Sequence, residues 1–326
     1  MSTDRTVALL TTGGTITMTR SEGGADISLT GAALGEKLGT LRALHVEVEE
    51  VFSKSSPNIS LLDMVGLAAV ALAKAASVDG IVIAHGTDTL EETAWALELL
   101  VHIDTPIVFT GAMRAFGSPG ADGLANLAAA CRVAADPKAR GLGVLAVIAD
   151  EIHAVELVHK AHVSRLNAFT SDPFAPLGWV SEDRIRLMLR PVRRPPRLSW
   201  GGRQAIVPIV DVFSGMEPAV LQVLTGTPVD AVVLNLPGGG HAPAAIVEDL
   251  SRIAQTKPVI FASRTRAGET LQETYGYAGS EIDLIARGLI PAGSLDALKA
   301  RIALALLLSK GAARNDIIQF FQAFRA

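Results

Sequence analysis

The sequence predicts an α/β protein with two domains, and three observations support this fold class. Short apolar runs alternate with longer segments of helical periodicity, a rhythm typical of a mostly parallel sheet covered by helices. The chain is 49% hydrophobic but only 5% aromatic, which suits the tightly layered interior of an α/β protein. Its 326 residues exceed the length of one average domain. We therefore expect a larger N-terminal α/β domain with a mostly parallel sheet and a smaller C-terminal α/β domain.

The N-terminal part of the chain alternates strand and helix patterns. Buried strands bounded by turn residues are predicted at residues 7–11, 80–85, 106–110 and 143–149. Helical periodicity predicts helices over residues 61–76, 90–102 and 121–135. Thr89, followed three residues later by Glu92, matches a capping box at the start of the second helix.

The alternation of strands and helices stops near residue 150 and resumes after residue 204. The polar stretch 151–190 predicts a hairpin and irregular loops. Residues 191–204, rich in proline and arginine, are the predicted linker between domains at 1–190 and 205–326. The arginines at the start of this segment are expected to be solvated; they are Arg190, Arg193, Arg194 and Arg197. In the C-terminal part, strands are predicted at 205–212, 231–236 and 258–262, and helices at 243–255, 280–287, 294–309 and 315–324.

Composition and charge argue against several classes of function. A net charge of −4 gives no general reason to bind nucleic acid. The single cysteine, Cys131, cannot form an internal disulfide, and its alanine-rich surroundings predict burial. The longest late apolar run, residues 302–308, is too short to cross a membrane, and the first residues lack the apolar core of a signal peptide. We therefore expect a cytoplasmic protein with no nucleic-acid or membrane partner.

Three histidines, His153, His159 and His162, are the residues that most suggest a metal site. His153 lies too far along the predicted hairpin, and no carboxylate stands at ligand spacing within residues 159–162. We expect no metal here.

The run TTGGTI at residues 11–16 lies where the first predicted strand ends. Ligands of open parallel sheets bind at the carboxyl ends of strands, so a functional loop is expected at this point. Gly13 and Gly14 allow the backbone to approach a ligand closely and should leave the Thr12 hydroxyl exposed. The spacing is not G-x-G-x-x-G, which argues against a dinucleotide site.

A second run, HGTDT at residues 85–89, closes another predicted strand and starts a helix. A hydroxyl, a carboxylate and the N–H groups of a helix N-terminus converge there, and such N–H groups can stabilise an anion. A threonine hydroxyl is a poor nucleophile and needs a partner to take its proton. Lys160 is the candidate, since a lysine held beside a carboxylate can do this.

Together with GAMR at residues 111–114 and the isolated Lys160, these two runs resemble the bacterial-type L-asparaginase family in order and spacing over nearly the whole chain. The resemblance implies that Thr12 is the nucleophile. It implies that Thr87 and Lys160, with Asp88, form a second catalytic group that relays protons. It also implies a reaction without metal or organic cofactor, and homodimers or homotetramers with the active site at a subunit boundary.

The same resemblance assigns substrate contacts. Ser56 would bind the α-carboxylate and Asp88 the α-amino group of a free amino acid, while the Ala112 main chain would contact the amide being cleaved. Pro57 stands beside the serine, where many family members have a polar side chain. It would make this wall of the pocket stiff, because proline has a fixed backbone angle and no N–H.

The chain also departs from the family pattern in its C-terminal contacts and its lid. Residues 18–39, where the family places a lid tyrosine, contain none. We expect Tyr275 to replace the lid tyrosine and Tyr277 to pack instead. The loop 238–241 aligns with one that offers a polar residue to the neighbouring site. The accompanying acidic residue is Glu281, Glu273 or Glu269, and Glu281 is assigned to the substrate amine.

The resemblance therefore implies hydrolysis of L-asparagine to L-aspartate and ammonia. The alternatives left open are the same chemistry on glutamine or a peptide-linked asparagine, and the glutaminase subunit of a tRNA-dependent amidotransferase. The amidotransferase subunit is disfavoured because little sequence precedes the first strand. A catalytically silent amino-acid-binding protein is also open, since the lid tyrosine is missing. The residues do not decide between a covalent acyl-enzyme and direct attack by a water.

Overall fold

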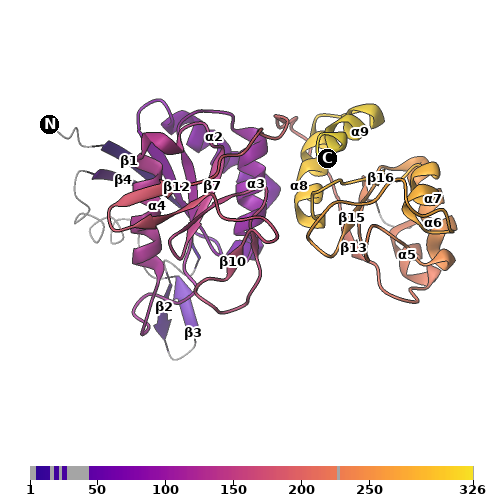
Figure 1. Cartoon of the computed structure of the whole chain (residues 1–326), viewed down its shortest axis with the longest axis horizontal. Coiled ribbons are helices and arrows are strands. Elements are labelled where there is room, and N and C mark those ends of the chain that lie inside the picture. Colours follow the sequence, from indigo (N-terminus) through magenta and orange to yellow (C-terminus); the bar gives the residue numbers. More distant parts are fainter. Residues whose placement is uncertain (1–4, 15–17, 22–23, 28–43, 226–227, 326) are drawn as a thin grey trace. The chain divides into compact units, whose positions relative to one another are not determined.

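The computed structural model describes the chain except for residues 1–4, 15–17, 22–23, 28–43, 226–227 and 326 (Figure 1). The chain divides into two compact units, Met1–Arg197 and Leu198–Ala326, and each is described by itself. That residues 191–204 act as a linker stays a prediction.

The first unit is built on an eight-stranded sheet. In spatial order its strands are β12 (Arg184–Leu187), β11 (Gly178–Ser181), β8 (Glu151–Ala154), β7 (Val144–Ile148), β6 (Ile107–Thr110), β5 (Gly80–Ala84), β1 (Arg5–Thr11) and β4 (Leu44–Glu50). The strands from β7 to β4 are parallel to one another. Strands β8, β11 and β12 extend the sheet in antiparallel fashion. The predicted α/β architecture with a mostly parallel sheet is confirmed.

Helices cover both faces of this sheet, as its buried parallel strands require. Helix α2 (Leu61–Lys74) packs on α3 (Leu90–Leu100), which contacts β6 and β7. Helix α4 (Gly123–Ala135) contacts β1, β5, β6 and β7, and Figure 1 shows it on the side of the sheet opposite α3. Cys131 on α4 is buried as predicted, and burial raises the pKa of its thiol to about 12.

The stretch 151–190 contains hairpins and loops, as predicted. Strands β7 and β8 are joined through Ala149 and Asp150, both at positive φ, which is the backbone that a tight two-residue hairpin turn requires. Strands β11 and β12 form a second hairpin. Between them the short strand β9 (His159–Lys160) pairs with β10 (Phe169–Thr170) and fixes the backbone at Lys160.

Strand β4 and the hairpin of β2 (Met18–Ser21) with β3 (Gly24–Ile27) were not predicted. Strand β4 is the outermost strand beside β1, and its side chains are only partly buried. Apolar and charged residues therefore alternate along it, and the continuous apolar run that marks the central strands is missing.

The interpretation of the proline-rich arginines as solvated is wrong for Arg194. Its guanidinium binds both oxygens of the buried Glu98, at 2.8 and 3.0 Å, and also donates to the carbonyls of Val101 and Ile103. Burial raises the pKa of Glu98, against the lowering effect of Arg194. A buried carboxylate needs such a partner, and sequence position alone did not show that α3 offers one.

The second unit is a smaller parallel sheet covered by helices. Its strands lie in the order β13 (Ile209–Asp211), β14 (Val232–Leu236), β15 (Val259–Ser263) and β16 (Ile290–Pro291). Its α-helices are α5 (Pro218–Thr225), α6 (Val247–Thr256), α7 (Glu281–Ala286), α8 (Ala297–Ser309) and α9 (Arg314–Gln322). Helix α5 and the short strand β16 were not predicted. No helix among the described residues of either unit is both long enough and apolar enough to cross a membrane.

Candidate active site

The carboxyl ends of β1 and β5 place Thr12 and Thr87 in neighbouring loops. The strands are parallel neighbours, with Thr11 opposite Ala84, so the residues that follow them leave the sheet side by side. The Thr12 backbone N–H and hydroxyl both donate to the carbonyl of Ala84, each at 3.1 Å. Thr12 is fully buried, which corrects the expectation of an exposed hydroxyl.

The reason for this burial is the close approach of the loops around Thr12. Gly13 and Gly14 have φ of 99° and 89°, a conformation that favours glycine. A Cβ on Gly14 would lie 2.4 Å from the Cα of Gly86, and one on Gly86 would lie 2.8 Å from the Cβ of Ser56. Three loops from distant parts of the sequence therefore touch through glycines, and this contact places Thr12, Thr87 and Ser56 in one region.

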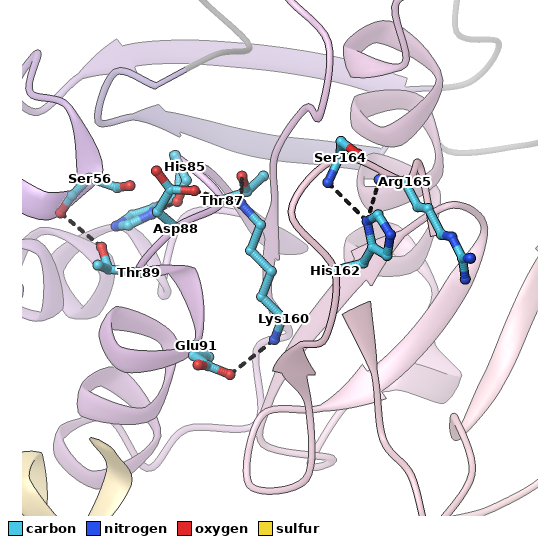
Figure 2. Close-up of polar contacts among 11 residues, drawn as sticks. Ser56, His85, Thr87, Asp88, Thr89, Glu91, Lys160, His162, Ser164 and Arg165 are labelled. Carbon is cyan, nitrogen blue, oxygen red and sulfur yellow. Dashed lines mark hydrogen bonds and ion pairs between the residues drawn. The ribbon is translucent and has the colours of Figure 1, made fainter. Parts of the chain in front are cut away.

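Thr87, Asp88 and Lys160 form a hydrogen-bonded group at the start of α3 (Figure 2). The Lys160 Nζ donates to the Thr87 hydroxyl at 2.9 Å and to the Asp88 carboxylate at 2.5 Å. The Lys160 side chain is 15% exposed, whereas that of Asp88 is 65% exposed. The amine is thus held against a hydroxyl on its buried side and a carboxylate on its open side, which suits a group that moves protons.

A carboxylate that sequence reasoning missed holds Lys160 in place. Glu91, one helical turn after Thr87, is buried and accepts the backbone N–H of Lys160 at 3.1 Å (Figure 2). It ties β9 to the first turn of α3, so the lysine and its hydroxyl partner are fixed to one another. In sequence, Glu91 was indistinguishable from the acidic residues that commonly begin helices.

The predicted capping box at the start of α3 is wrong. Thr89 occupies the N-cap position, but its side chain makes no capping bond. Its hydroxyl instead donates to the carbonyl of Ser56 at 2.8 Å, which fixes the short 3-10 turn Ser56–Asn58 against the helix (Figure 2). Ser56 is buried and Pro57 is exposed on this turn. Tertiary contact with Ser56 has displaced the local capping bond.

The loop after β6 is held by two side chains of α4 that sequence reasoning also missed. The Asp122 carboxylate accepts the backbone N–H groups of Met113, at 2.9 and 3.1 Å, and of Arg114, at 2.9 Å. The Asn126 amide donates to the carbonyl of Gly111 at 2.9 Å and to Asp122 at 3.0 Å. Its oxygen accepts the N–H of Ala149 at 3.0 Å, so the amide joins this loop to the end of β7.

This loop borders Thr87. A Cβ on Gly111 would lie 2.9 Å from the Thr87 methyl group and 2.6 Å from the carbonyl oxygen of His85. The structure therefore gathers seven of the predicted site residues into neighbouring parts of the first unit: Thr12, Ser56, Pro57, Thr87, Asp88, Ala112 and Lys160.

His85, the first residue of the HGTDT run, is a buried neutral imidazole. Its Nδ1 lies 2.7 Å from the carbonyl oxygen of Gly86, so this nitrogen carries the proton and donates. Burial lowers the pKa of the imidazole to about 4, although the Gly86 bond opposes the shift. The ring fixes the backbone that leads into Thr87.

Glu281 and Tyr275, the remaining predicted residues, belong to the second unit. Glu281 is fully buried and accepts the backbone N–H groups of Thr274 and Tyr275, at 2.7 and 2.6 Å, and lies 3.1 Å from His241 Nε2. Burial alone would raise the pKa of Glu281, but these backbone bonds outweigh it and hold the pKa below its usual value. The roles assigned to Glu281 and Tyr275 stay predictions.

Tyr275 and Tyr277 stand beside the His241 ring. Their ring centroids lie 5.1 and 5.7 Å from that of His241, in edge-on arrangements. The two tyrosines are 43% and 52% exposed, so neither packs beneath the loop.

The histidines considered for a metal site have other partners. His153 is buried with its Nδ1 2.9 Å from the hydroxyl of Ser171, and His162 accepts the N–H groups of Ser164 and Arg165 (Figure 2). Within the described part of the chain, no three His, Cys, Asp or Glu side chains gather closely enough to hold a metal ion.

Comparison with known proteins gives a consistent result across the chain. Two family models match it, one described as "Asparaginase, N-terminal" over residues 6–193 and one as "Glutaminase/Asparaginase C-terminal domain" over residues 206–321. The chain is 34% identical over 320 residues to a probable L-asparaginase of Deinococcus radiodurans, covering 97% of this chain and 96% of that protein. It is 33% identical over 330 residues to a glutaminase-asparaginase of Pseudomonas aeruginosa, covering 97% of this chain and 89% of that protein.

A solved structure agrees with these relatives. The crystal structure of a probable cytoplasmic L-asparaginase from Campylobacter jejuni matches with a TM-score of 0.86 at 27% identity, and covers 98% of this chain and 99% of that one. The chain belongs to the asparaginase family.

Proposed function

We propose that this protein hydrolyses the side-chain amide of L-asparagine to give L-aspartate and ammonia, with Thr12 as the nucleophile. Its family membership makes it an amidohydrolase. The observation that carries the proposal is the bond of Lys160 to both Thr87 and Asp88, in a loop that touches the Thr12 loop. A buried hydroxyl hydrogen-bonded to an amine, which is itself paired with a carboxylate, can take a proton from a second hydroxyl or from water.

The proposed reaction balances with the groups of this site and one water. The Thr12 oxygen adds to the side-chain carbonyl carbon, and its hydroxyl proton passes to a neighbouring acceptor. The C–N bond then breaks, and the nitrogen takes up a proton and leaves as ammonia, with an ester left on Thr12. Water adds to this ester, Thr87 with Lys160 takes its proton, and aspartate leaves as the Thr12 hydroxyl is restored.

The substrate contacts extend this proposal. Ser56 binds the α-carboxylate and Asp88 the α-amino group, and the Ala112 main chain contacts the amide that is cleaved. The exposure of Asp88 beside a buried amine supports its role, because a carboxylate that faces the open side of the site can pair with an ammonium. Glu281 and Tyr275 are kept as proposed substrate contacts, and Pro57 is proposed to form a stiff wall.

Glutamine is the second candidate substrate, because the Pseudomonas aeruginosa relative is named a glutaminase-asparaginase. Its side chain is one methylene longer, and its α-groups must reach the same anchors. A misfit of one methylene usually changes kcat/KM by about 10–200-fold. We therefore infer a preference for asparagine of at least about tenfold, and comparable kcat/KM for the two amides would contradict it.

The assembly and location complete the proposal. We propose a homodimer or homotetramer that acts in the cytoplasm on a free amino acid. The likeness to a structure titled as a probable cytoplasmic asparaginase supports the location. Light scattering of the purified protein tests the assembly.

Ammonia release from asparagine, glutamine and a peptide-linked asparagine, measured in parallel with calorimetric binding of aspartate, tests the function. Hydrolysis of asparagine is expected. Binding of aspartate without ammonia release from any amide would mean a silent amino-acid-binding protein and overturn the proposal.

A further inference from the structure

The first residues of the loop after β6 are held by hydrogen bonds to Asp122 and Asn126. Asp122 takes the N–H groups of Met113 and Arg114, and Asn126 binds the carbonyl of Gly111. Asp122 stands at the N-cap of α4, yet its side chain makes no capping bond to that helix. A carboxylate at this position normally stabilises its own helix, so its use on the loop instead sacrifices a cap to fix the loop backbone.

These hydrogen bonds do not include the carbonyl of Ala112, which lies between Gly111 and Met113. Ala112 is only 2% exposed, and no residue in the described part of the chain donates a hydrogen bond to its carbonyl. A buried carbonyl without a donor is unfavourable, and in native proteins a donor from protein, water or ligand almost always satisfies it. This carbonyl can therefore accept a hydrogen bond that the described residues do not supply.

The direction of the carbonyl follows from the peptide geometry. The Ala112 carbonyl and the Met113 N–H belong to the same planar trans peptide, so they point in opposite directions. Because Asp122 holds the Met113 N–H toward α4, the Ala112 carbonyl points away from α4. Asn126 fixes the preceding peptide in the same way through Gly111, whose Cα lies against Thr87.

We propose that Asp122 and Asn126 are positioning residues that present the Ala112 carbonyl to the N–H of the scissile amide, and so make the enzyme selective for amides over esters. The inference rests on the proposed function. A side-chain amide carries two N–H donors on its leaving nitrogen, whereas the leaving oxygen of an ester carries none. The hydrogen bond to Ala112 is therefore available to asparagine and not to its ester analogue.

The test compares asparagine with aspartate β-methyl ester in the full-length protein. Aspartate formation is measured for both, since they share this product. Asp122→Asn keeps the volume of the side chain but replaces one of the two accepting oxygens by an NH₂ group, which cannot accept an N–H. We expect kcat/KM for the amide to fall at least about fivefold more than that for the ester, the range of one neutral hydrogen bond. Asn126→Ser should shift the ratio in the same direction.

The matched control is Thr110→Val, at the end of the same strand. It removes a buried hydroxyl that donates to the carbonyl of Val147 at 2.7 Å, and it leaves the loop backbone bonds intact. A general loss of order at this edge of the sheet would lower both activities alike, as expected for Thr110→Val. Circular dichroism and thermal unfolding establish that each variant is folded. Either Asp122→Asn or Asn126→Ser suffices for the comparison.

An equal fall of the two activities in Asp122→Asn and Asn126→Ser overturns the inference while the proposed function stands. Failure of the parent protein to hydrolyse either substrate is a different result and defeats the proposed function itself. If the parent turns over only the amide, calorimetric binding of both compounds in the Thr12→Ala background makes the same comparison. In that background, Asp122→Asn must weaken the binding of the amide by at least about fivefold and leave the binding affinity of the ester unchanged.

Discussion

Replacing Lys160 by methionine removes the amine but keeps a side chain of similar length. Two hydrogen bonds are lost, to the Thr87 hydroxyl at 2.9 Å and to the Asp88 carboxylate at 2.5 Å. The backbone bond from Lys160 to Glu91 does not involve the side chain and should survive. The substitution therefore isolates the role of the amine from that of the strand that carries it.

The structure predicts very different sizes for the effects on stability and on activity. Asp88 is 65% exposed, so the ion pair is screened by solvent and its loss should cost at most about 1 kcal/mol of unfolding free energy. Proton transfer by a positioned group contributes about 10²–10⁴-fold to a rate. We therefore expect kcat to fall about a thousandfold, which corresponds to about 4 kcal/mol of transition-state stabilisation.

Steady-state ammonia release gives kcat and KM for the variant, and chemical denaturation gives its stability. The matched control is Lys74→Met, which removes a lysine paired with Glu49 at 2.8 Å outside the proposed site. It should change stability little and keep full activity. A Lys160→Met enzyme with near-normal turnover would refute the relay, and an unfolded variant would refute the stability argument.

Three further predictions concern the fold and the second unit. Arg194→Ala leaves Glu98 buried without its partner, so the free energy of unfolding in urea should fall by about 3–5 kcal/mol, and a change under 1 kcal/mol would show that the pair is not needed. His85 and His153 have pKa values lowered by burial to about 4, whereas histidine in an unfolded chain titrates near 6.5. The unfolded state therefore binds more protons between these two pH values. As the pH falls from 6.5 to about 4, each histidine should lower the free energy of unfolding by roughly 3 kcal/mol, and its contribution then levels off. Unfolding curves that coincide at pH 7 and pH 4.5 would contradict this. Tyr275→Phe removes only a hydroxyl, and if Tyr275 takes the proton of the nucleophile, kcat should drop at least about a hundredfold with little change in KM. Parental activity in this variant would remove Tyr275 from that role.

The sequence alone determined the fold class, because hydrophobic periodicity is a local property. Central strands such as Gly80–Ala84 are buried on both faces and read as continuous apolar runs, and helices such as α3 carry their own period. The edge strand β4 escaped prediction since one side of it is exposed, and its alternating residues give a weaker signal. The glycine and threonine runs also marked the strand ends where a site belongs.

Only the tertiary structure decided which polar groups meet. Thr89 and Asp122 both stand at the N-caps of helices, and a capping bond was predicted for Thr89. In the fold, Thr89 binds the carbonyl of Ser56, 33 residues away, and Asp122 binds the backbone of Met113 and Arg114. Arg194 was likewise predicted to be solvated, and the fold instead pairs it with Glu98.

The physical reason lies in the range of the two kinds of interaction. Burial of apolar surface is non-directional and follows the period of each element, so a sequence pattern reports it. A hydrogen bond requires two groups within about 3 Å and in line, and for groups far apart in sequence this depends on the whole packing of the sheet and its helices. The sequence therefore indicated where the proposed site lies, and the packing of three loops against one another through Gly14 and Gly86 decided which side chains meet there.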